Sequence, residues 1–221
     1  MIAPADVKKV AIIGNGLMGQ GIAQVFAREG RSAHVIGRND DSLARARTAI
    51  EANIEAFVER GLHDRPKADA MLGQITLGTD YDAAADADFV IEAVPAVRDL
   101  QIEVFGRLDA ICDPKVVLGS TSGQPISLMV DRMKHPERAV AMHFVYPAQI
   151  MPLVEVCGGS QTTPEVVQWA CDLLTEVGQT PAVMNKEVDG FIINRLQFAV
   201  LREAWSMWAN GIASAEAIDN S

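Results

Sequence analysis

His143 and Glu155 are the two residues of this chain whose types and spacing best suit acid–base chemistry. They lie twelve residues apart in the stretch MHFVYPAQIMPLVEV, where His143 ends one predicted strand and Glu155 lies in the next. A histidine paired with a carboxylate can act as a general base, because the carboxylate orients the ring and stabilises the imidazolium. A hydrogen-bonded histidine of the protein core is an equally good interpretation of the spacing alone.

A glycine-rich stretch near the N-terminus has the features of a phosphate-binding loop. GNGLMGQG contains Gly14, Gly16 and Gly19 in the spacing GxGxxG, between a predicted strand and a predicted helix. This context predicts a dinucleotide site: Gly14 allows a tight turn, Gly16 lets the backbone approach a pyrophosphate, and Gly19 permits close helix packing. Leu17 and Met18 begin the helix, whose free N–H groups favour a phosphate. The alternative is a tight turn that only joins strand to helix.

The end of the second predicted strand bears on which dinucleotide would bind. An acidic residue that holds the ribose hydroxyls of NAD is expected about 20 residues further along the chain, but Gly37 occupies that place. Arg38 follows, and it can stack on adenine and pair with a 2′-phosphate. We therefore expect NAD or NADP as cofactor, with a preference for NADP. Two alternatives stay open: Arg38 is a solvated loop residue, or Asp40 or Asp41 turns back to the ribose.

Short apolar runs alternate with amphipathic segments along most of the chain. This alternation predicts an α/β fold of the Rossmann type, with a doubly wound, mostly parallel sheet. Residues 40–61 and 67–74 are expected to form an inserted helical hairpin, and Thr163 or Thr162 is expected to cap a helix over 164–178. The predicted strands cover residues 7–14, 33–37, 75–78, 88–94, 116–121, 139–144, 153–158 and 180–184; the other predicted helices cover 17–30, 99–111 and 190–211.

The pattern changes between Val188 and Gly190, where a long helix rich in Phe, Leu and Trp begins. We expect residues 1–188 to form a dinucleotide-binding domain and residues 189–221 to form the start of a C-terminal helical domain. The apolar residues of this helix lie on more than one face, so the helix needs a partner. We expect a second copy of the chain, as in a homodimer; a truncated or partly lost domain is an equally open explanation.

Charge and hydropathy exclude several classes of partner. The formal net charge is −10, which disfavours nucleic acids and anionic membranes, because both select for basic patches. Backbone amides and a few cationic side chains can still hold an anion, so we expect a small-molecule substrate. No stretch has the ~18 apolar residues of a membrane helix, and the N-terminus lacks the pattern of a signal peptide.

Cysteine and histidine usage points to a cytoplasmic protein without a metal. The three cysteines form no CxxC pair, which favours a reducing compartment. None of the four histidines has metal-ligand spacing with another histidine or a cysteine, so we expect no metal site. The motif GxxxxGK[ST] is absent, which argues against a P-loop NTPase.

Six segments together resemble the L-3-hydroxyacyl-CoA dehydrogenase family, which also includes 3-hydroxybutyryl-CoA, L-gulonate and carnitine dehydrogenases. They follow the family's order over nearly the whole chain: VAIIGNGLMGQGIAQVFAREG, DFVIEAVP, GSTSGQPI, PERAVAMHF, MPLVEV and DGFIINRL. The resemblance implies an oxidoreductase that interconverts a 3-hydroxyacyl-CoA and a 3-ketoacyl-CoA, by hydride transfer to or from a nicotinamide dinucleotide.

The resemblance also implies roles for individual residues. His143 matches the catalytic base of the family, and Glu155 matches the carboxylate that pairs with it. Asn194, in GFIINRL, matches an asparagine that hydrogen-bonds near the substrate oxygen and the histidine.

Two further matches concern the walls of the site. Ser122 matches a hydroxyl that touches the substrate oxygen. The segment is one residue shorter than the family's SNTSS, so Ser120 or Thr121 could take that role instead. Glu92 matches a position beside the cofactor.

Several departures from the family pattern leave the substrate open. Tyr146 stands where the family commonly has Asn, Gln101 where it has Lys, and Ala96 where it has an acidic residue. These positions contact cofactor or substrate, so a dehydrogenase of a 3-hydroxy acid without CoA, such as a sugar acid or carnitine, is the first alternative. The phosphates of a CoA substrate would need cations. The candidates are Arg65 with Lys67, or Arg132 with Lys134. The alternative is that these cations only form a solvated surface.

A third interpretation is a non-catalytic dinucleotide-binding protein. Family members usually continue for several tens of residues beyond IDNS, as a helical domain that forms the dimer and part of the substrate pocket. Only one long helix and a short following segment are present in this chain. The presence of His143, Glu155 and Asn194 together argues against the non-catalytic interpretation.

Overall fold

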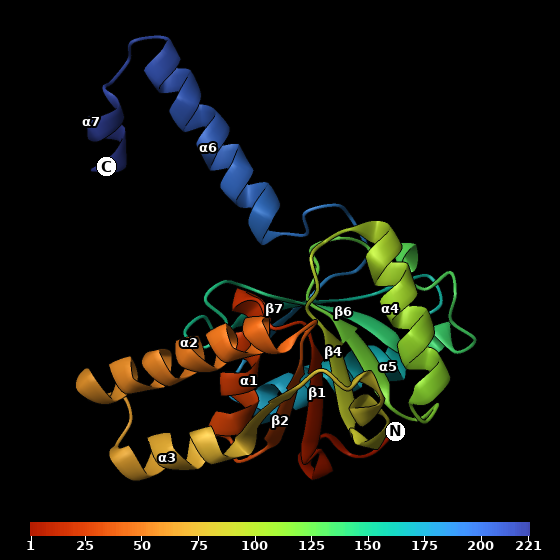
Figure 1. Cartoon of the computed structure of the whole chain (residues 1–221). Coiled ribbons are helices and arrows are strands. Elements are labelled where there is room, and N and C mark those ends of the chain that lie inside the picture. The colour runs from red at the N-terminus through yellow and green to blue at the C-terminus, as the bar shows by residue number, and fades with distance from the viewer.

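The computed structural model describes residues 1–221, and its centre is one eight-stranded sheet (Figure 1). The strand order is β3-β2-β1-β4-β5-β6-β7-β8, and all neighbours are parallel except β6 and β7. This arrangement confirms the predicted Rossmann-type, mostly parallel sheet. The strands are β1 (Lys9–Ile13), β2 (Ser32–Ile36), β3 (Ile75–Gly78), β4 (Phe89–Glu92), β5 (Val117–Ser120), β6 (Ala139–Phe144), β7 (Leu153–Gly158) and β8 (Thr180–Val183).

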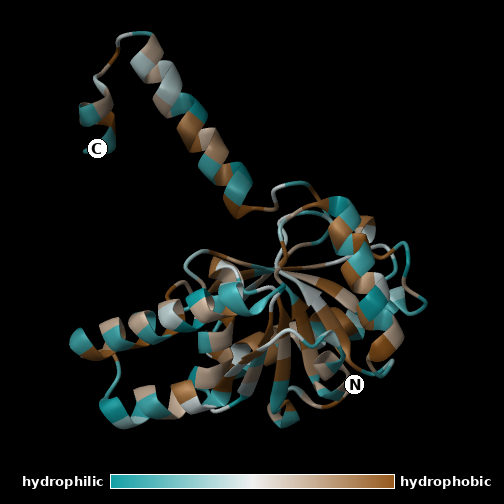
Figure 2. Ribbon diagram, in the orientation of Figure 1, coloured by the Kyte–Doolittle hydropathy of each residue, from teal (hydrophilic) through white to brown (hydrophobic).

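Helices cover both faces of the sheet, as the doubly wound class requires. Helices α1, α3 and α5 pack into one apolar cluster with strand residues, and α4 packs into a second cluster on the opposite face. The central strands are therefore apolar along most of their length, which gives the brown centre of Figure 2. The helices are α1 (Leu17–Arg28), α2 (Asp40–Glu59), α3 (Arg65–Gln74), α4 (Arg98–Ile111), α5 (Pro164–Glu176), α6 (Ile193–Ala209) and α7 (Ala215–Asp219).

Alternation along β1 sorts its side chains between the two clusters. Val10 and Ile12 join the cluster of α1 and α5, whereas Ala11 and Ile13 join the cluster of α4. Successive strand residues point to opposite faces, so one short strand contributes to two layers of the core.

The predicted helical hairpin is formed by α2 and α3, which lie side by side and project from the sheet (Figure 1). Asn39 caps α2 by accepting a hydrogen bond from the backbone N–H of Ser42. Asp64 caps α3 in the same way through Lys67, so α3 starts two residues before the predicted helix. Thr163 is the N-cap residue of α5, as expected, but its hydroxyl makes no capping hydrogen bond, and Thr162 Oγ1 donates to the carbonyl of Ala139.

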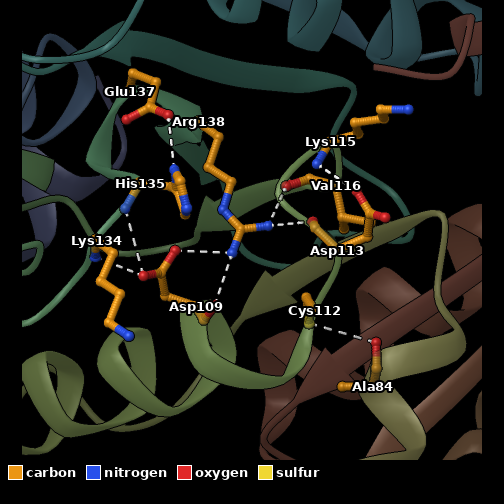
Figure 3. A network of polar contacts seen from close by, with 10 residues as sticks. All are labelled: Ala84, Asp109, Cys112, Asp113, Lys115, Val116, Lys134, His135, Glu137 and Arg138. Atoms are coloured by element: carbon orange, nitrogen blue, oxygen red, sulfur yellow. Dashed lines mark hydrogen bonds and ion pairs between the residues drawn. The ribbon is translucent and has the colours of Figure 1, made fainter.

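A buried ion pair joins α4 to Arg138, the residue before β6 (Figure 3). It lies at the end of the sheet where the parallel strands begin, away from the glycine-rich loop. Arg138 Nη2 lies 2.8 Å from Asp109 Oδ1, and both side chains are at most 3% exposed. The guanidinium also donates to the carbonyls of Asp113, Val116 and Asp109. Arg138 thereby holds together the end of α4 and the turn that leads from α4 to β5.

The C-terminal segment departs from the predicted helix at its start. The prediction began the helix at Gly190, but α6 begins at Ile193, because Gly190 and Phe191 have positive φ angles of 73° and 44°. Helices α6 and α7 stand away from the sheet and contain no buried residue (Figure 1). None of the helices is both long enough and apolar enough to cross a membrane.

Candidate active site

The glycine-rich loop after β1 has the geometry of a phosphate cradle. Gly14 has a φ of 121°, which favours glycine, and a β-carbon there would collide with the carbonyl of Ala93. A β-carbon on Gly19 would collide with the carbonyl of Gly14, so this glycine allows α1 to pack closely. Gly16, the N-cap of α1, has no atom within 4 Å of its β-carbon position. The backbone at Gly16 is therefore open to a ligand at the positive end of the helix dipole, which suits a pyrophosphate.

A cavity of about 750 Å³ opens beside this loop. It extends from the loop to the end of β2 and along α4 as far as Arg107. This region is the switch point of the sheet, where the strand order reverses between β1 and β4. Its size and position suit the adenosine and pyrophosphate of a dinucleotide. The predicted cofactor residues Gly14, Gly16, Leu17, Met18, Gly37 and Arg38 all line it, together with Val94, Leu100, Tyr81 and Arg107 among others.

The charged side chains that line this cavity are both cationic. Arg38 and Arg107 contribute guanidinium groups, and no Asp or Glu is among the lining residues. Arg107 lies 3.9 Å above the ring of Tyr81, at a cation–π distance, and its Nη2 is 3.6 Å from the exposed carboxylate of Asp82. Burial raises the pKa of the Tyr81 hydroxyl, so this residue is a neutral, flat wall of the cavity.

Gly37 occupies the place where an acidic residue would hold a ribose. A β-carbon at this position would lie 2.6 Å from Leu43 Cδ2 and 3.0 Å from Asn15 Cγ. Asp40 and Asp41 lie in the first turn of α2, are exposed, and do not line the cavity. The end of β2 therefore presents a cation and no carboxylate to this part of the cavity.

His143 and Glu155 face each other across the antiparallel pair of β6 and β7. They are direct register partners, and His143 Nδ1 lies 2.7 Å from Glu155 Oε2. The Glu155 side chain is 1% exposed and the His143 side chain 15%. Oε1 of Glu155 accepts two more hydrogen bonds, from the backbone N–H groups of Ile192 and Ile193. The carboxylate can therefore hold the imidazole with Nδ1 protonated, which leaves Nε2 as the free proton acceptor.

Asn194 and His143 border the same small space above Gly123. A β-carbon on Gly123 would lie 3.3 Å from both Asn194 Nδ2 and His143 Nε2. Phe191 closes another side, with its ring perpendicular to the imidazole and 5.6 Å from it between centroids. An amide donor and a ring nitrogen thus converge on one point, as proton transfer to or from a substrate oxygen requires.

Glu92 lies behind the wall of the cavity rather than on it. Its carboxylate is fully buried and accepts hydrogen bonds from Ser120 Oγ, Gln101 Nε2 and the backbone N–H of Val94. Burial raises the pKa of Glu92, although the three donors oppose the rise. Glu92 supports the strand end from which Val94 reaches the cavity, and Glu92 itself is not among the residues that line the cavity.

The same network distinguishes the roles of the three candidate hydroxyl groups, which belong to Ser120, Thr121 and Ser122. Ser120 is fully buried and commits its hydroxyl proton to Glu92 across 2.6 Å. Ser120 Oγ also accepts from the backbone N–H of Ser122 at 3.2 Å, so it positions the loop that carries Ser122. Ser122 Oγ accepts from the N–H of Gln124 at 3.2 Å, and its own proton stays available to a substrate oxygen. Thr121 is half-buried, and it is near Gly123 in the sequence, two residues before it.

Sequence reasoning missed three contributors to the site. Arg107 follows Leu100 and Val104 at helical spacing, and this spacing could have placed it on the cavity face of α4. Tyr81 lies in a short 3₁₀-helix without a motif, so no local signal marked it. Phe191 stood within the quoted GFIINRL segment, but its contact with His143 depends on a turn that replaces the predicted first turn of α6.

The cradle and the cavity beside it are features of the Rossmann class of fold, and the histidine–carboxylate pair lies on two neighbouring strands of the same sheet. The chain belongs to the 3-hydroxyacyl-CoA dehydrogenase family. Residues 9–188 match the family model described as 3-hydroxyacyl-CoA dehydrogenase, NAD binding domain, and residues 190–221 match the model described as 3-hydroxyacyl-CoA dehydrogenase, C-terminal domain.

Similar proteins include dehydrogenases named for a CoA ester and a dehydrogenase named for carnitine. The chain is 39% identical over 220 residues to L-carnitine dehydrogenase of Streptomyces griseus, covering 99% of the chain and 65% of that protein. It is 35% identical to 3-hydroxyadipyl-CoA dehydrogenase of Escherichia coli K12, covering 97% of the chain and 45% of that enzyme. The chain thus spans at most two thirds of these two relatives.

Solved structures agree with the sheet and helices described above. The crystal structure of 3-hydroxybutyryl-CoA dehydrogenase from Escherichia coli has a TM-score of 0.89 at 33% identity, covering 95% of the chain and 44% of that structure. The (S)-3-hydroxybutyryl-CoA dehydrogenase of Ralstonia eutropha has a TM-score of 0.90 at 26% identity, covering 96% and 75%.

Proposed function

We propose that this chain interconverts a 3-hydroxyacyl-CoA and a 3-ketoacyl-CoA, with a nicotinamide dinucleotide as hydride carrier. Residues 1–188 would form the dinucleotide-binding domain and residues 189–221 the start of the C-terminal helical domain. The single observation that carries the proposal is the 2.7 Å contact of His143 Nδ1 with the buried carboxylate of Glu155, beside Asn194. This arrangement leaves one basic nitrogen facing the space in which a substrate hydroxyl would lie.

The roles of the residues follow from this geometry. His143 Nε2 takes the proton of the 3-hydroxyl group in oxidation and returns it in reduction, and Glu155 stabilises the imidazolium between the two. The amide of Asn194 and the hydroxyl of Ser122 donate hydrogen bonds to the substrate oxygen and orient it. A bound nicotinamide supplies the hydride acceptor or donor. The cradle of Gly14, Gly16 and Gly19 would hold its pyrophosphate.

We propose NADP as the preferred dinucleotide. The support is the charge of the cavity: Arg38 and Arg107 line it, and no carboxylate does. A 2′-phosphate gains charge-assisted hydrogen bonds from guanidinium groups, whereas the ribose hydroxyls of NAD would lack their usual acidic partner at Gly37.

A 3-hydroxy acid without CoA, such as carnitine, is the second candidate. Arg65, one of the cations that could meet a CoA phosphate, is instead bound to Glu55 at 2.6 Å and lies near Asp69. The 39% identity to an L-carnitine dehydrogenase adds to this observation. A substrate of this kind would need neither Arg65 nor Lys67.

The exposed apolar side chains of α6 support a proposed homodimer. Leu196, Phe198, Trp205 and Trp208 are each at least 57% exposed. Such a surface is covered in most assembled proteins, and a second copy of the chain would do so. Light scattering coupled to gel filtration measures the mass directly, and a mass of 23.8 kDa would refute the dimer.

The test of the reaction is the loss of 340 nm absorbance with acetoacetyl-CoA and with 3-dehydrocarnitine, each in parallel with NADH and NADPH. We expect the fastest oxidation with acetoacetyl-CoA and NADPH. Turnover of 3-dehydrocarnitine alone would transfer the proposal to the second candidate. His143→Ala should abolish turnover and leave dinucleotide binding unchanged; retained turnover would remove His143 from its role.

A further inference from the structure

Four consecutive residues at the start of the C-terminal segment, Gly190 to Ile193, each contact a part of the candidate site. The backbone N–H of Gly190 donates to the carbonyl of Gly123 at 3.0 Å. The ring of Phe191 lies against His143. The N–H groups of Ile192 and Ile193 donate to Glu155 Oε1 at 2.7 and 2.8 Å. This segment is therefore a wall of the catalytic centre.

The contacts depend on a strained backbone at Phe191. Its φ of 44° makes it the one non-glycine residue of the chain with a positive φ, and it follows Gly190, whose φ is 73°. Residues other than glycine disfavour this left-handed backbone conformation, because they carry a β-carbon. Glycine at position 191 would relieve the backbone, but it would remove a fully buried ring from the side of His143. Strain that the surrounding structure maintains is an indication of function.

The turn has two separate effects on the histidine–carboxylate pair. Two successive N–H groups hold Glu155 Oε1, as a backbone nest holds an anion, so only Oε2 remains for His143. The Phe191 ring meets the imidazole edge to face at 5.6 Å and 90°, a favourable aromatic geometry that limits rotation of the imidazole. Both partners are thus fixed from the same short segment.

We propose that Phe191 is a positioning residue for catalysis, and that the left-handed turn at Gly190 and Phe191 fixes the orientation of His143 and Glu155. The inference rests on the proposed function, in which these two residues form the acid–base pair. The turn selects the tautomer of His143 with Nδ1 protonated and directs Nε2 at the substrate.

A purely structural role for the ring is the competing explanation, and the chain offers a matched control. Phe57 and His63, at the α2–α3 hairpin, form a second T-shaped pair with a centroid distance of 5.4 Å and an angle of 84°. Phe57→Ala removes an aromatic ring from the same kind of pair, at a position far from Phe191 in the sequence. Comparison of Phe57→Ala with Phe191→Ala separates the general effect of removing an aromatic ring beside a histidine from the effect of removing the ring beside His143.

The experiment combines kinetics with long-range ¹H–¹⁵N NMR of the histidine side chains, assigned with a His143→Gln variant. We expect Phe191→Ala to lower kcat about 10- to 100-fold, as small misplacements of catalytic groups do, with the Kd of NADPH unchanged. The wild-type signal of His143 should show protonation at Nδ1, and the variant should show exchange between tautomers. Phe191→Leu should recover part of both losses, and Phe57→Ala should match the wild type.

Wild-type kcat together with a wild-type His143 signal in Phe191→Ala would overturn the inference. If this variant fails to fold, Phe191→Leu decides in the same manner: a lowered kcat and a displaced signal support positioning, and wild-type values refute it. If the wild type itself has no turnover, the proposed function fails. The NMR comparison of Phe191→Ala with the wild type then decides the positioning inference alone.

Discussion

Ser120 donates a hydrogen bond of 2.6 Å from its hydroxyl to Glu92 Oε2, between the adjacent ends of β5 and β4. The two residues connect both sides of the site, because Glu92 also accepts from Val94 at the cavity wall, and Ser120 accepts from the N–H of Ser122. A buried carboxyl group thus links the wall of the dinucleotide cavity to the loop that would touch the substrate. Substitution of Glu92 therefore tests the part that this buried carboxyl group plays in the fold.

Glu92→Gln should change the pH dependence of stability. Burial raises the pKa of Glu92 in the folded state above its ordinary value of 4.5, so the folded state binds this proton more tightly than the unfolded state. The contribution of Glu92 to stability is then fully present below pH 4.5 and is lost as the pH rises through the raised pKa. Urea unfolding at pH 5 to 9 should show a shallower decline for the variant than for the wild type. The buried and unpaired Oε1 of Gln101 offers an acceptor for the new amide. Equal pH slopes would contradict the prediction.

Breaking the buried pair of Arg138 and Asp109 should destabilise the fold strongly. Either Arg138→Met or Asp109→Asn leaves its partner without a counter-charge at sites that are at most 3% exposed, which costs about 3–5 kcal/mol. The double variant Arg138→Met with Asp109→Leu should recover most of this loss, measured by urea unfolding at pH 7. A double variant that is as unstable as the sum of the two single variants would contradict this expectation.

Acid should weaken the same pair. Burial alone would raise the pKa of Asp109, but hydrogen bonds from Arg138 and from the N–H groups of Lys134 and His135 outweigh it and lower this pKa. The contribution of Asp109 is therefore present above its ordinary pKa of 3.8 and is lost as the pH falls through the lowered value. Unfolding curves between pH 5 and pH 2 should separate the wild type from Asp109→Asn, whose stability should fall less over this range.

Ser122→Ala and Ser120→Ala should differ in what they impair. Ser122→Ala removes a hydroxyl proton that no protein group uses, so kcat should fall about 10-fold or more, while the lost acceptor for the N–H of Gln124 should cost only about 1 kcal/mol of unfolding free energy. Ser120→Ala removes a donor to a buried carboxylate and should cost about 1–3 kcal/mol of unfolding free energy. The opposite result, with catalysis lost and stability retained in Ser120→Ala, would assign the substrate contact to Ser120.

Arg38→Leu and Arg107→Leu should each reduce the preference for NADPH. The loss of one charge-assisted hydrogen bond is worth about 1.5–3 kcal/mol, or roughly 10- to 100-fold in kcat/KM for NADPH, with NADH little affected. Arg47→Leu, on the exposed face of α2 beside Glu51, is the control with the same loss of charge. A fall in kcat/KM that is equal for both dinucleotides would show that these guanidinium groups do not contact a 2′-phosphate.

Features with a local cause could be predicted from the sequence. The strands, the glycine-rich loop and the hairpin of α2 and α3 depend on residues that are near one another in the chain, and the structure has each of them. The closeness of His143 and Glu155 could also be anticipated, because both lie in neighbouring strands of a single hairpin.

Features with a tertiary cause could not. Ser120 lies next to Ser122 in sequence, and only the position of Glu92, 28 residues away, shows that Ser120 is committed elsewhere. The hydroxyl of Thr162, one of the two candidates for the cap of α5, donates to the carbonyl of Ala139 in β6 instead. The change of pattern at Gly190 predicted a helix start there, but the contacts with Glu155 and Gly123 favour a left-handed turn.

The turn at Gly190 and Phe191 limits how this family can be taken apart and recombined. The two family models meet between residues 188 and 190, so a module exchanged at that junction would separate His143 from Phe191 and Asn194. Residues 1–188 joined to a new partner would keep the glycine-rich loop and the cavity, but they would lose the residues that contact His143 and Glu155 from the C-terminal segment. A chimera that keeps these contacts should therefore carry residues 190–194 together with residues 1–188.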